Sequence, residues 1–209
     1  MTLFDLAFVI SFLVTVVALI RACYLLLRKR MAAAKQTATR LVAFVAIYAV
    51  TLVVVSLTTP QTRLHLGDVR CFDEWCITVT GASRQPSIAD VSANGLFYVV
   101  TVQVSSRARG RRQREVDVDT YLTDTRGRRF DVSPAGQGAL QRAGLAGAAV
   151  TSFVDPGATF ESRLAYDVPK DVTDLGFVKT SHGWFPTRLI IGESSSFLHR
   201  PTIVQLGPS

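Results

Sequence analysis

Two long apolar runs dominate the first sixty residues. The first, "LAFVISFLVTVVALIRACYLLL", covers residues 6–27 and carries one charge, Arg21. The second, "LVAFVAIYAVTLVVVSLT", covers residues 41–58 and is uncharged. About 20 apolar helical residues cross a hydrocarbon core of roughly 30 Å. Lipid also requires backbone hydrogen bonds to close within a segment, so the many valines do not indicate strands here. The pattern predicts two transmembrane helices.

After Pro60 the pattern changes to strict alternation. In "ATFESRLAYDV", residues 158–168, Phe160 and every second residue after it form one face, which is typical of a half-buried strand. Similar alternation occurs at 116–124 and 96–106. Further strands are predicted at about 64–70, 75–81, 128–132, 174–180, 186–192 and 200–206. Gly, Pro, Asn and Asp separate them, so we expect an all-β, immunoglobulin-like antiparallel sandwich over residues 61–209.

Two segments of this region have no strand pattern. Residues 135–150 are rich in Gly and Ala and are expected to form a loop with a short helical turn. Residues 82–95 are expected to be a link, which could cross the sandwich and reverse the direction of the strands that follow. About 145 residues are enough to bury a working core without metals.

Charge assigns a topology to the two helices. The 209-residue chain carries a net charge of +7. Residues 1–60 hold six Lys/Arg and one acid, Asp5 (6 − 1 = +5), while the remainder holds 17 Lys/Arg and 15 Asp/Glu (17 − 15 = +2). The predicted loop 28–40 contains five of these cations and no acid: Arg28, Lys29, Arg30, Lys35 and Arg40. Short cation-rich loops stay cytoplasmic. We therefore expect a multi-pass cell-membrane protein, with residues 1–60 as the anchor and its C-terminal domain on the extracytoplasmic side, either a periplasm or the cell exterior.

Alternatives to this membrane reading remain open. A signal peptide is disfavoured for the first run, because it lacks a cationic start and a small-x-small cleavage site. A start at Met31 would give the second run a cationic start, but "SLTTPQ" is a poor cleavage site. Arg21 is expected to extend its long side chain to the cationic end of its helix, or else to pair with a partner helix.

The β-region resembles a bacterial family of extracytoplasmic immunoglobulin-like domains. The similarity rests on "NGLFYVVTVQVSS", "VDVDTYLTDTRGRRFDVS", "VDPGATFESRLAYDVP" and "FLHRPTIVQL", and covers roughly residues 64–206. That family is described as telokin-like, is similar to a mycobacterial immunoprotective secreted antigen, and is mostly of unknown function. The resemblance implies a sandwich outside the cytoplasm and no catalytic residues. The two helices and "CFDEWC" depart from the family's simpler lipid-anchored members.

The cysteines of "CFDEWC", Cys71 and Cys76, can be interpreted in several ways. Outside the cytoplasm a disulfide persists, and closing so small a ring is worth roughly 2 kcal/mol. We expect it to hold the turn between strands 64–70 and 75–81, with Trp75 nearby. Zinc would need more soft ligands, and Cys23 lies in the first apolar run. A redox couple would favour C-x-x-C spacing, and calcium would need regularly spaced oxygens around Asp73 and Glu74.

Two arginine-rich segments are candidate interaction sites. "RARGRRQRE" (107–115) is expected to be a hairpin tip, either simply solvated or a docking patch for an anionic lipid, polymer or protein face: Arg107, Arg109, Arg111, Arg112 and Arg114. "RGRR" is expected at the opposite end of the sandwich, where Arg126, Arg128 and Arg129 would meet lipid headgroups. Nucleic acid is disfavoured, because the first loop lacks interleaved aromatic residues.

The sequence offers no catalytic constellation. Ser181 and His182 are adjacent on a predicted strand and so point to opposite faces. We expect a non-enzymatic binding module with no cofactor or metal, whose partners are the bilayer and a cell-envelope protein, polymer or anionic lipid. Trp184 and Phe185 could add an exposed aromatic patch. The alternative is an accessory subunit of a membrane complex, assembled through Arg21, Tyr48 and the small residues Ala43, Ala46 and Ala49.

Overall fold

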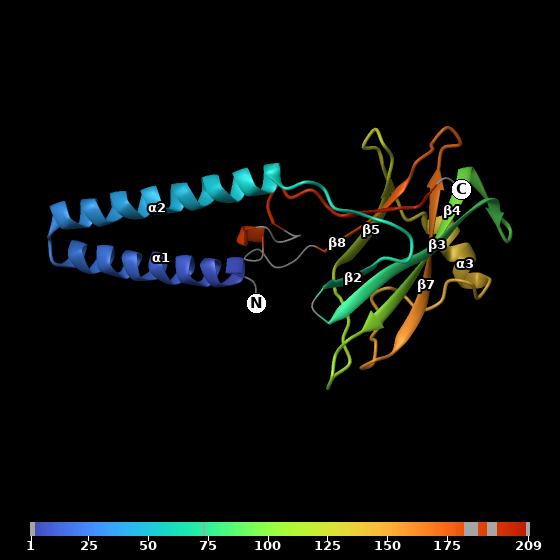
Figure 1. Cartoon of the computed structure of the whole chain (residues 1–209), viewed down its shortest axis with the longest axis horizontal. Coiled ribbons are helices and arrows are strands. Elements are labelled where there is room, and N and C mark those ends of the chain that lie inside the picture. Colours follow the sequence, from blue (N-terminus) through green and yellow to red (C-terminus); the bar gives the residue numbers. More distant parts are fainter. Residues whose placement is uncertain (1–2, 73, 182–187, 192–195, 208–209) are drawn as a thin grey trace. The chain divides into compact units, whose positions relative to one another are not determined.

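The computed structural model of the chain describes residues 3–72, 74–181, 188–191 and 196–207, which fall into two compact units (Figure 1). One unit is Met1–Pro60 with Gly183–Arg200, and the other is Gln61–His182 with Pro201–Ser209. The first division coincides with the predicted domain boundary after residue 60. The prediction of one uninterrupted sandwich from 61 to 209 differs from the structure, since 183–200 belongs with the helices.

The helical unit is an antiparallel hairpin of α1 (Leu3–Leu27) and α2 (Met31–Thr58). Both helices are long and apolar enough to cross a membrane by length and composition. The predicted cytoplasmic loop 28–40 is wrong in extent, because only residues 28–30 form a turn and 31–40 are the start of α2. That stretch, "MAAAKQTATR", is rich in alanine, the strongest helix former. The hydropathy pattern alone therefore predicted the start of α2 ten residues too late.

The short turn fixes which residues of the two helices lie level. Because α1 ends at Leu27 and α2 begins at Met31, these two residues lie at the same height along the antiparallel hairpin. Any two residues whose numbers sum to 58 then lie at about the same height (27 + 31, 21 + 37, 18 + 40). One groove accordingly contains Arg21 with Thr37, and Ala18 with Arg40. Arg21 thus lies among the cations of α2, at the polar end of the hairpin. The apolar part common to both helices is α1 before Arg21 and α2 after Arg40.

The described residues of 183–200 contact α2 through polar groups. The Tyr48 hydroxyl donates to the Leu189 carbonyl (2.6 Å), and the hydroxyl oxygens of Ser56 and Ser196 lie 3.1 Å apart. Leu52, between Tyr48 and Ser56 on the same helix face, is buried. Described residues 188–191 form a turn and contain no strand, so the predicted strand 186–192 is wrong for that part. Residues 186, 187 and 192 lie outside the described residues.

The second unit is a sandwich of two sheets, which confirms the predicted fold class. One sheet has the order β1-β9-β8-β5-β6 and the other β2-β3-β4-β7. All pairs are antiparallel except β1 with β9. The strands are β1 (Arg63–Leu64), β2 (Val69–Phe72), β3 (Trp75–Ile88), β4 (Val91–Ser106), β5 (Val118–Thr123), β6 (Arg129–Asp131), β7 (Thr159–Val168), β8 (Gly176–Ser181) and β9 (Ile203–Gln205).

The predicted link 82–95 is instead part of a long hairpin. β3 continues to Ile88, which pairs with Val91 of β4. Gly81, just before this segment, and Pro86, within it, lie at strand irregularities: the register shifts between Val79 and Gly81, and again between Gln85 and Ser87. Proline is tolerated in a strand at such positions because the ladder needs no hydrogen bond there. The hairpin therefore returns within its own sheet and does not cross the sandwich.

The main core lies between the sheets, and a small helix covers one outer face. Inward residues of β4, such as Val100, Val102 and Val104, are fully buried. On the other face Phe97 and Ala165 pack with α3 (Pro134–Arg142), where a helical turn was predicted. Ser133 caps this helix by accepting a hydrogen bond from the Gly136 amide (3.2 Å). The covered sheet holds β2, β3 and β4, which position the site described next.

Candidate functional site

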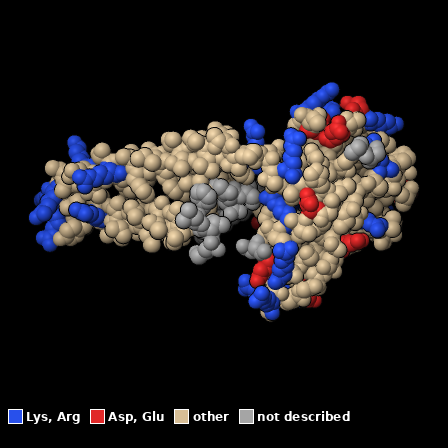
Figure 2. All heavy atoms as spheres, viewed as in Figure 1, with Lys and Arg blue, Asp and Glu red and all other residues tan. Residues whose placement is uncertain are grey.

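The candidate site is at the end of the sandwich where β2 turns into β3 and β4 leaves its sheet. Trp75 pairs with Ser106, so the 72–75 turn and the loop 107–117 lie at the same end. Figure 2 shows Lys and Arg side chains gathered at the lower end of the sandwich in that view. One open cavity of about 460 Å³ lies here, and Glu74, Gln113 and Glu115 form part of its lining. We define the basic–aromatic surface by the arginines and rings of that lining: Arg111, Arg112, Arg114, Phe153, Phe72 and Trp75.

A disulfide holds the turn beneath this surface. Cys71 and Cys76 are directly opposite each other on β2 and β3, and their sulfur atoms are bonded (2.01 Å). The predicted structural disulfide is therefore confirmed. It flanks Phe72 and Trp75, whose ring centroids are 6.0 Å apart. The cross-link restricts the backbone that presents both rings.

Backbone hydrogen bonds fix the basic loop against its neighbours. The Arg107 amide donates to the Glu74 carbonyl (2.7 Å). Gln113 and Val154 exchange two hydrogen bonds (2.9 and 2.8 Å), so the loop pairs locally with the segment that carries Phe153. The Gln113 side-chain amide also donates to the Glu74 carboxylate. The loop is thus tied at two points, and the arginines project from an ordered backbone.

Two arginines stack on one exposed aromatic ring. The guanidinium carbons of Arg112 and Arg114 each lie 4.7 Å from the ring centroid of Phe153, whose side chain is about half exposed (49%). Stacking restricts the guanidinium planes while leaving their N–H edges free to bind. Among the residues that the structure describes, no carboxylate forms an ion pair with Arg111, Arg112 or Arg114. The two carboxylates in the cavity lining, Glu74 and Glu115, are bonded to Gln113 and Lys179 instead. The three guanidinium groups therefore keep N–H groups that can bind an anion.

A buried lysine underlies the two rings. Lys179, on β8, has only 3% of its side chain exposed, and its ammonium lies 3.6 Å from the Phe72 ring centroid and 5.2 Å from that of Trp75. It also bonds Glu115 (3.0 Å). Burial lowers the pKa of Lys179, although Glu115 opposes this effect. Glu115 also lines the cavity, but its carboxylate is bonded to Lys179 and not to the arginines.

The structure sorts the five predicted arginines into two groups. Arg111, Arg112 and Arg114 line the shared cavity, whereas Arg107 and Arg109 do not. The predicted hairpin tip is wrong in one respect: β4 and β5 belong to different sheets, so the loop is a crossover between sheets. The loop itself lacks aromatic residues, as the sequence shows, but other segments bring three rings beside it.

Phe153 and Lys179 were not predicted from the sequence as residues of this site. Lys179 follows Phe177 by two residues on a strand, and this spacing places it on the same face as a buried ring, so a signal was present. Phe153 lies more than 35 residues along the chain from the arginines, and no local pattern indicates that it meets them.

The second arginine segment is at the opposite end of β5 and is largely paired within the protein. Arg128 bonds Asp124 (2.6 Å), and Arg129 bonds Asp131 (2.6 Å) and Asp119 (2.8 Å). Desolvation acts to raise the pKa of Asp124, but hydrogen bonds from Arg128 and from the Arg126 amide outweigh it, so its pKa is lowered. Headgroup contacts by Arg126, Arg128 and Arg129 stay a prediction. At Arg128 and Arg129, a lipid phosphate would compete with the aspartates that already bind these side chains.

Other predicted features stay untested. Asp73, His182, Trp184 and Phe185 lie outside the described residues. Within the described part of the chain, no group of three or more His, Cys, Asp or Glu side chains is arranged to hold a metal ion. The expectation that the protein is not an enzyme stays a prediction.

Comparisons with known proteins add a fold likeness only. No family model and no curated protein matches the sequence, so the telokin-like resemblance also stays a prediction. A conserved hypothetical protein from Bacillus anthracis is 10% identical, with a TM-score of 0.46, over 56% of this chain and 89% of that chain. An uncharacterized β-sandwich protein from Clostridium difficile is 12% identical, with a TM-score of 0.43, over 71% and 95%. The secreted protein MPT63 from Mycobacterium tuberculosis is 12% identical, with a TM-score of 0.41, over 57% and 90%.

Proposed function

We propose that the chain is a membrane-anchored extracytoplasmic binding module that recognises an anionic partner through the basic–aromatic surface. The observation that carries the proposal is the cluster of three arginines around Phe153, ordered by the loop and without carboxylate partners among the described residues. A guanidinium group binds carboxylate or phosphate through two parallel N–H groups. The chemical class of the partner is therefore a cell-envelope polymer or protein face that presents such anions.

Two features support the anchor and the orientation in this proposal. The helical hairpin is long and apolar, and its turn carries Arg28, Lys29 and Arg30, which favours a cytoplasmic tip. The chain enters the sandwich at Gln61, which shares a cavity with Thr125 and Gly127. The chain therefore enters the sandwich near the end of β5 that leads to Thr125, and the basic–aromatic surface is at the other end of β5.

The test compares two sets of substitutions with equal charge. The purified full chain is titrated with polyphosphate and, separately, with polyglutamate, at two salt concentrations. Arg111, Arg112 and Arg114 are replaced together by Gln, and the matched control replaces Arg107, Arg109 and Arg126. We expect the first set to weaken binding at least about tenfold, since each exposed charge-assisted contact is worth up to about 1 kcal/mol, and the control to weaken it less than about threefold.

Equal losses in the two sets would show that only net charge matters and would end the proposal. A Phe153→Ala variant supplies an uncharged check, because it removes the stacking platform and leaves every arginine. We expect it to weaken binding severalfold.

A second candidate function keeps the helices as the assembling element. Ala43, Ala46 and Ala49 are exposed on α2, and small residues allow close helix contact. Tyr48 is engaged with Leu189 within the chain, which weakens its predicted role in such a contact. A complex held by the helices keeps its partner when Arg111, Arg112 and Arg114 are replaced, so the same variants in cells separate the two functions.

A further inference from the structure

A groove runs along one face of the helical hairpin, and its lining changes from cationic to apolar. It holds about 640 Å³, within the range of ligand sites. Both helices contribute residues at helical spacing. Those from α1 are Leu13, Val14, Val17, Ala18, Arg21 and Leu25, and those from α2 are Ala33, Gln36, Thr37, Arg40, Leu41 and Phe44. Arg30, from the turn, completes the lining. Ala18 and Ala33 are the smallest residues of this lining.

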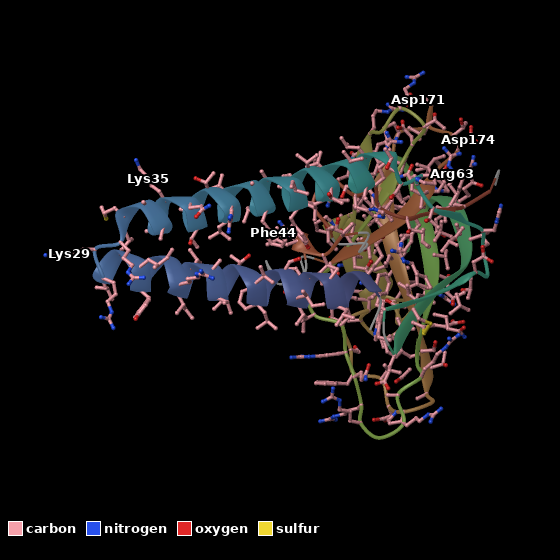
Figure 3. All side chains as sticks on the ribbon, turned by 60° about the vertical axis from the view of Figure 1, so that its left-hand side comes forward. Lys29, Lys35, Phe44, Arg63, Asp171 and Asp174 are labelled. Carbon is pink, nitrogen blue, oxygen red and sulfur yellow. A yellow bond between two sulfur atoms is a disulfide. The ribbon has the colours of Figure 1, made fainter. Side chains whose placement is uncertain are left out.

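The order of residues along the groove follows from the hairpin register. Arg30 is the last residue of the turn, and Arg21 and Arg40 lie about two to three helical turns further along. Beyond Arg40, away from the turn, every lining residue is apolar: Leu13, Val14, Val17, Leu41 and Phe44. Figure 3 shows Phe44 on the α1 side of α2, whereas Lys35 points away from α1 and Lys29 lies at the turn. The charged part of the groove therefore meets the apolar part at Arg21 and Arg40.

The three groove arginines have no acidic partner in the described helical unit. None of them takes part in an ion pair among the described residues. Asp5 is the only acid of the first sixty residues, and it is sixteen residues from Arg21 along the same helix, or about 24 Å. At the end of the hairpin that carries the turn, Figure 2 shows several Lys and Arg side chains and no acidic one on the visible face.

From this arrangement we infer that the groove binds one anionic phospholipid from the leaflet on the side of the hairpin turn. Arg21, Arg30 and Arg40 bind the headgroup phosphate, and one acyl chain lies along Val14, Val17 and Phe44. Basic pockets between membrane helices recognise anionic headgroups in this way. The inference rests on the proposed membrane anchor. It is independent of the basic–aromatic surface of the sandwich.

The test measures lipid binding to the detergent-solubilised full chain by native mass spectrometry. Phosphatidylglycerol and phosphatidylcholine with the same acyl chains are the probes. One variant replaces Arg21, Arg30 and Arg40 by Gln, and the matched control replaces Arg28, Lys29 and Lys35, which carry the same charge and do not line the groove. A third variant, Ala33→Phe, keeps every charge and fills the groove.

We expect the wild type to bind its first phosphatidylglycerol more tightly than phosphatidylcholine, and inorganic phosphate not to displace it. The groove triple is expected to weaken the first site at least about tenfold, since each arginine near a lipid headgroup contributes about fivefold. Ala33→Phe is expected to weaken it at least about tenfold as well, because the added ring occupies the space of the lipid. The control triple is expected to weaken it less than about threefold.

Equal losses in the two triples, an unaffected Ala33→Phe, or displacement by inorganic phosphate would each overturn the inference. Resistance of the wild type to carbonate extraction from membranes tests the anchor separately. A failure of the groove is thereby distinguished from a failure of the anchor.

Discussion

Lys179 shows how a single buried charge connects the core to the proposed site. Its ammonium lies against Phe72 and bonds Glu115, so it links the buried end of β8 to the basic loop. A buried ion pair loses hydration for both charges, and this loss often cancels the attraction between them. Lys179 is therefore expected to contribute to the arrangement of the site more than to its stability.

Two substitutions separate these contributions. Lys179→Met keeps the unbranched shape and removes the buried charge, so we expect the free energy of unfolding at pH 7 to stay within about 1 kcal/mol of the wild type. Glu115→Gln leaves the ammonium without its carboxylate and is expected to cost about 2 kcal/mol, less than for a fully buried pair because Glu115 is partly exposed. Urea unfolding of the detergent-solubilised chain, followed by Trp75 fluorescence in a Trp184→Phe background, measures both. Equal losses of unfolding free energy in the two variants would mean that the Lys179–Glu115 ion pair stabilises the fold.

The same variant predicts a pH dependence. Because burial lowers the pKa of Lys179 in the folded state, the unfolded chain holds its proton at pH values where the folded chain has lost it. Wild-type stability is therefore expected to gain a component as pH rises from the lowered pKa toward 10.5, the ordinary lysine value. Lys179→Met should lack this component. A rise of the same size in both proteins would assign it to other groups.

At the scale of elements, the disulfide hairpin supports the basic loop. The turn carries Glu74, whose carbonyl accepts the Arg107 amide, while the Gln113 amide is bound to Val154 in a different segment. The double substitution Cys71→Ser, Cys76→Ser is expected to lower stability by about 2 kcal/mol. Hydrogen exchange of the full chain should then become faster at the Arg107 amide and stay nearly unchanged at Gln113. Unchanged exchange at Arg107 would mean that the turn keeps its shape without the cross-link.

The sequence predicted the elements better than their ends and contacts. Alternation identified β4, β5 and β7, and hydropathy identified both helices, because each pattern reports the surface that an element buries. The length of β3 was missed because Gly81 and Pro86 usually end strands, and here they accompany irregularities within one. The start of α2 was missed because alanine and polar residues form helix without being apolar.

Contacts between distant segments carry no local signal. Tyr48 was predicted to line a contact with a partner helix, but its hydroxyl bonds the Leu189 carbonyl, 141 residues away along the chain. The level placement of Arg21 with Thr37 depends on a three-residue turn that the sequence analysis took as a thirteen-residue loop. The Gln113–Val154 pairing brings Phe153 beside the arginines. Each of these contacts depends on how the folded chain aligns distant segments, which no local sequence pattern reports.

For the whole molecule, the side of the membrane decides which partners the sandwich can meet. A membrane-impermeant maleimide is applied to intact cells, or to spheroplasts where an outer membrane is present, before and after mild reduction, in a Cys23→Ser background. We expect Cys71 and Cys76 to be labelled only after reduction, because an extracytoplasmic disulfide persists in an oxidising compartment. Labelling that needs lysis and no reductant would instead place the sandwich in the cytoplasm, where the basic–aromatic surface would meet acidic proteins or nucleic acid. In that case the hairpin turn and the lipid groove would lie in the extracytoplasmic leaflet, and the residues that bind the lipid would be the same. The proposed extracytoplasmic function would fail at this measurement, whereas the lipid inference would not.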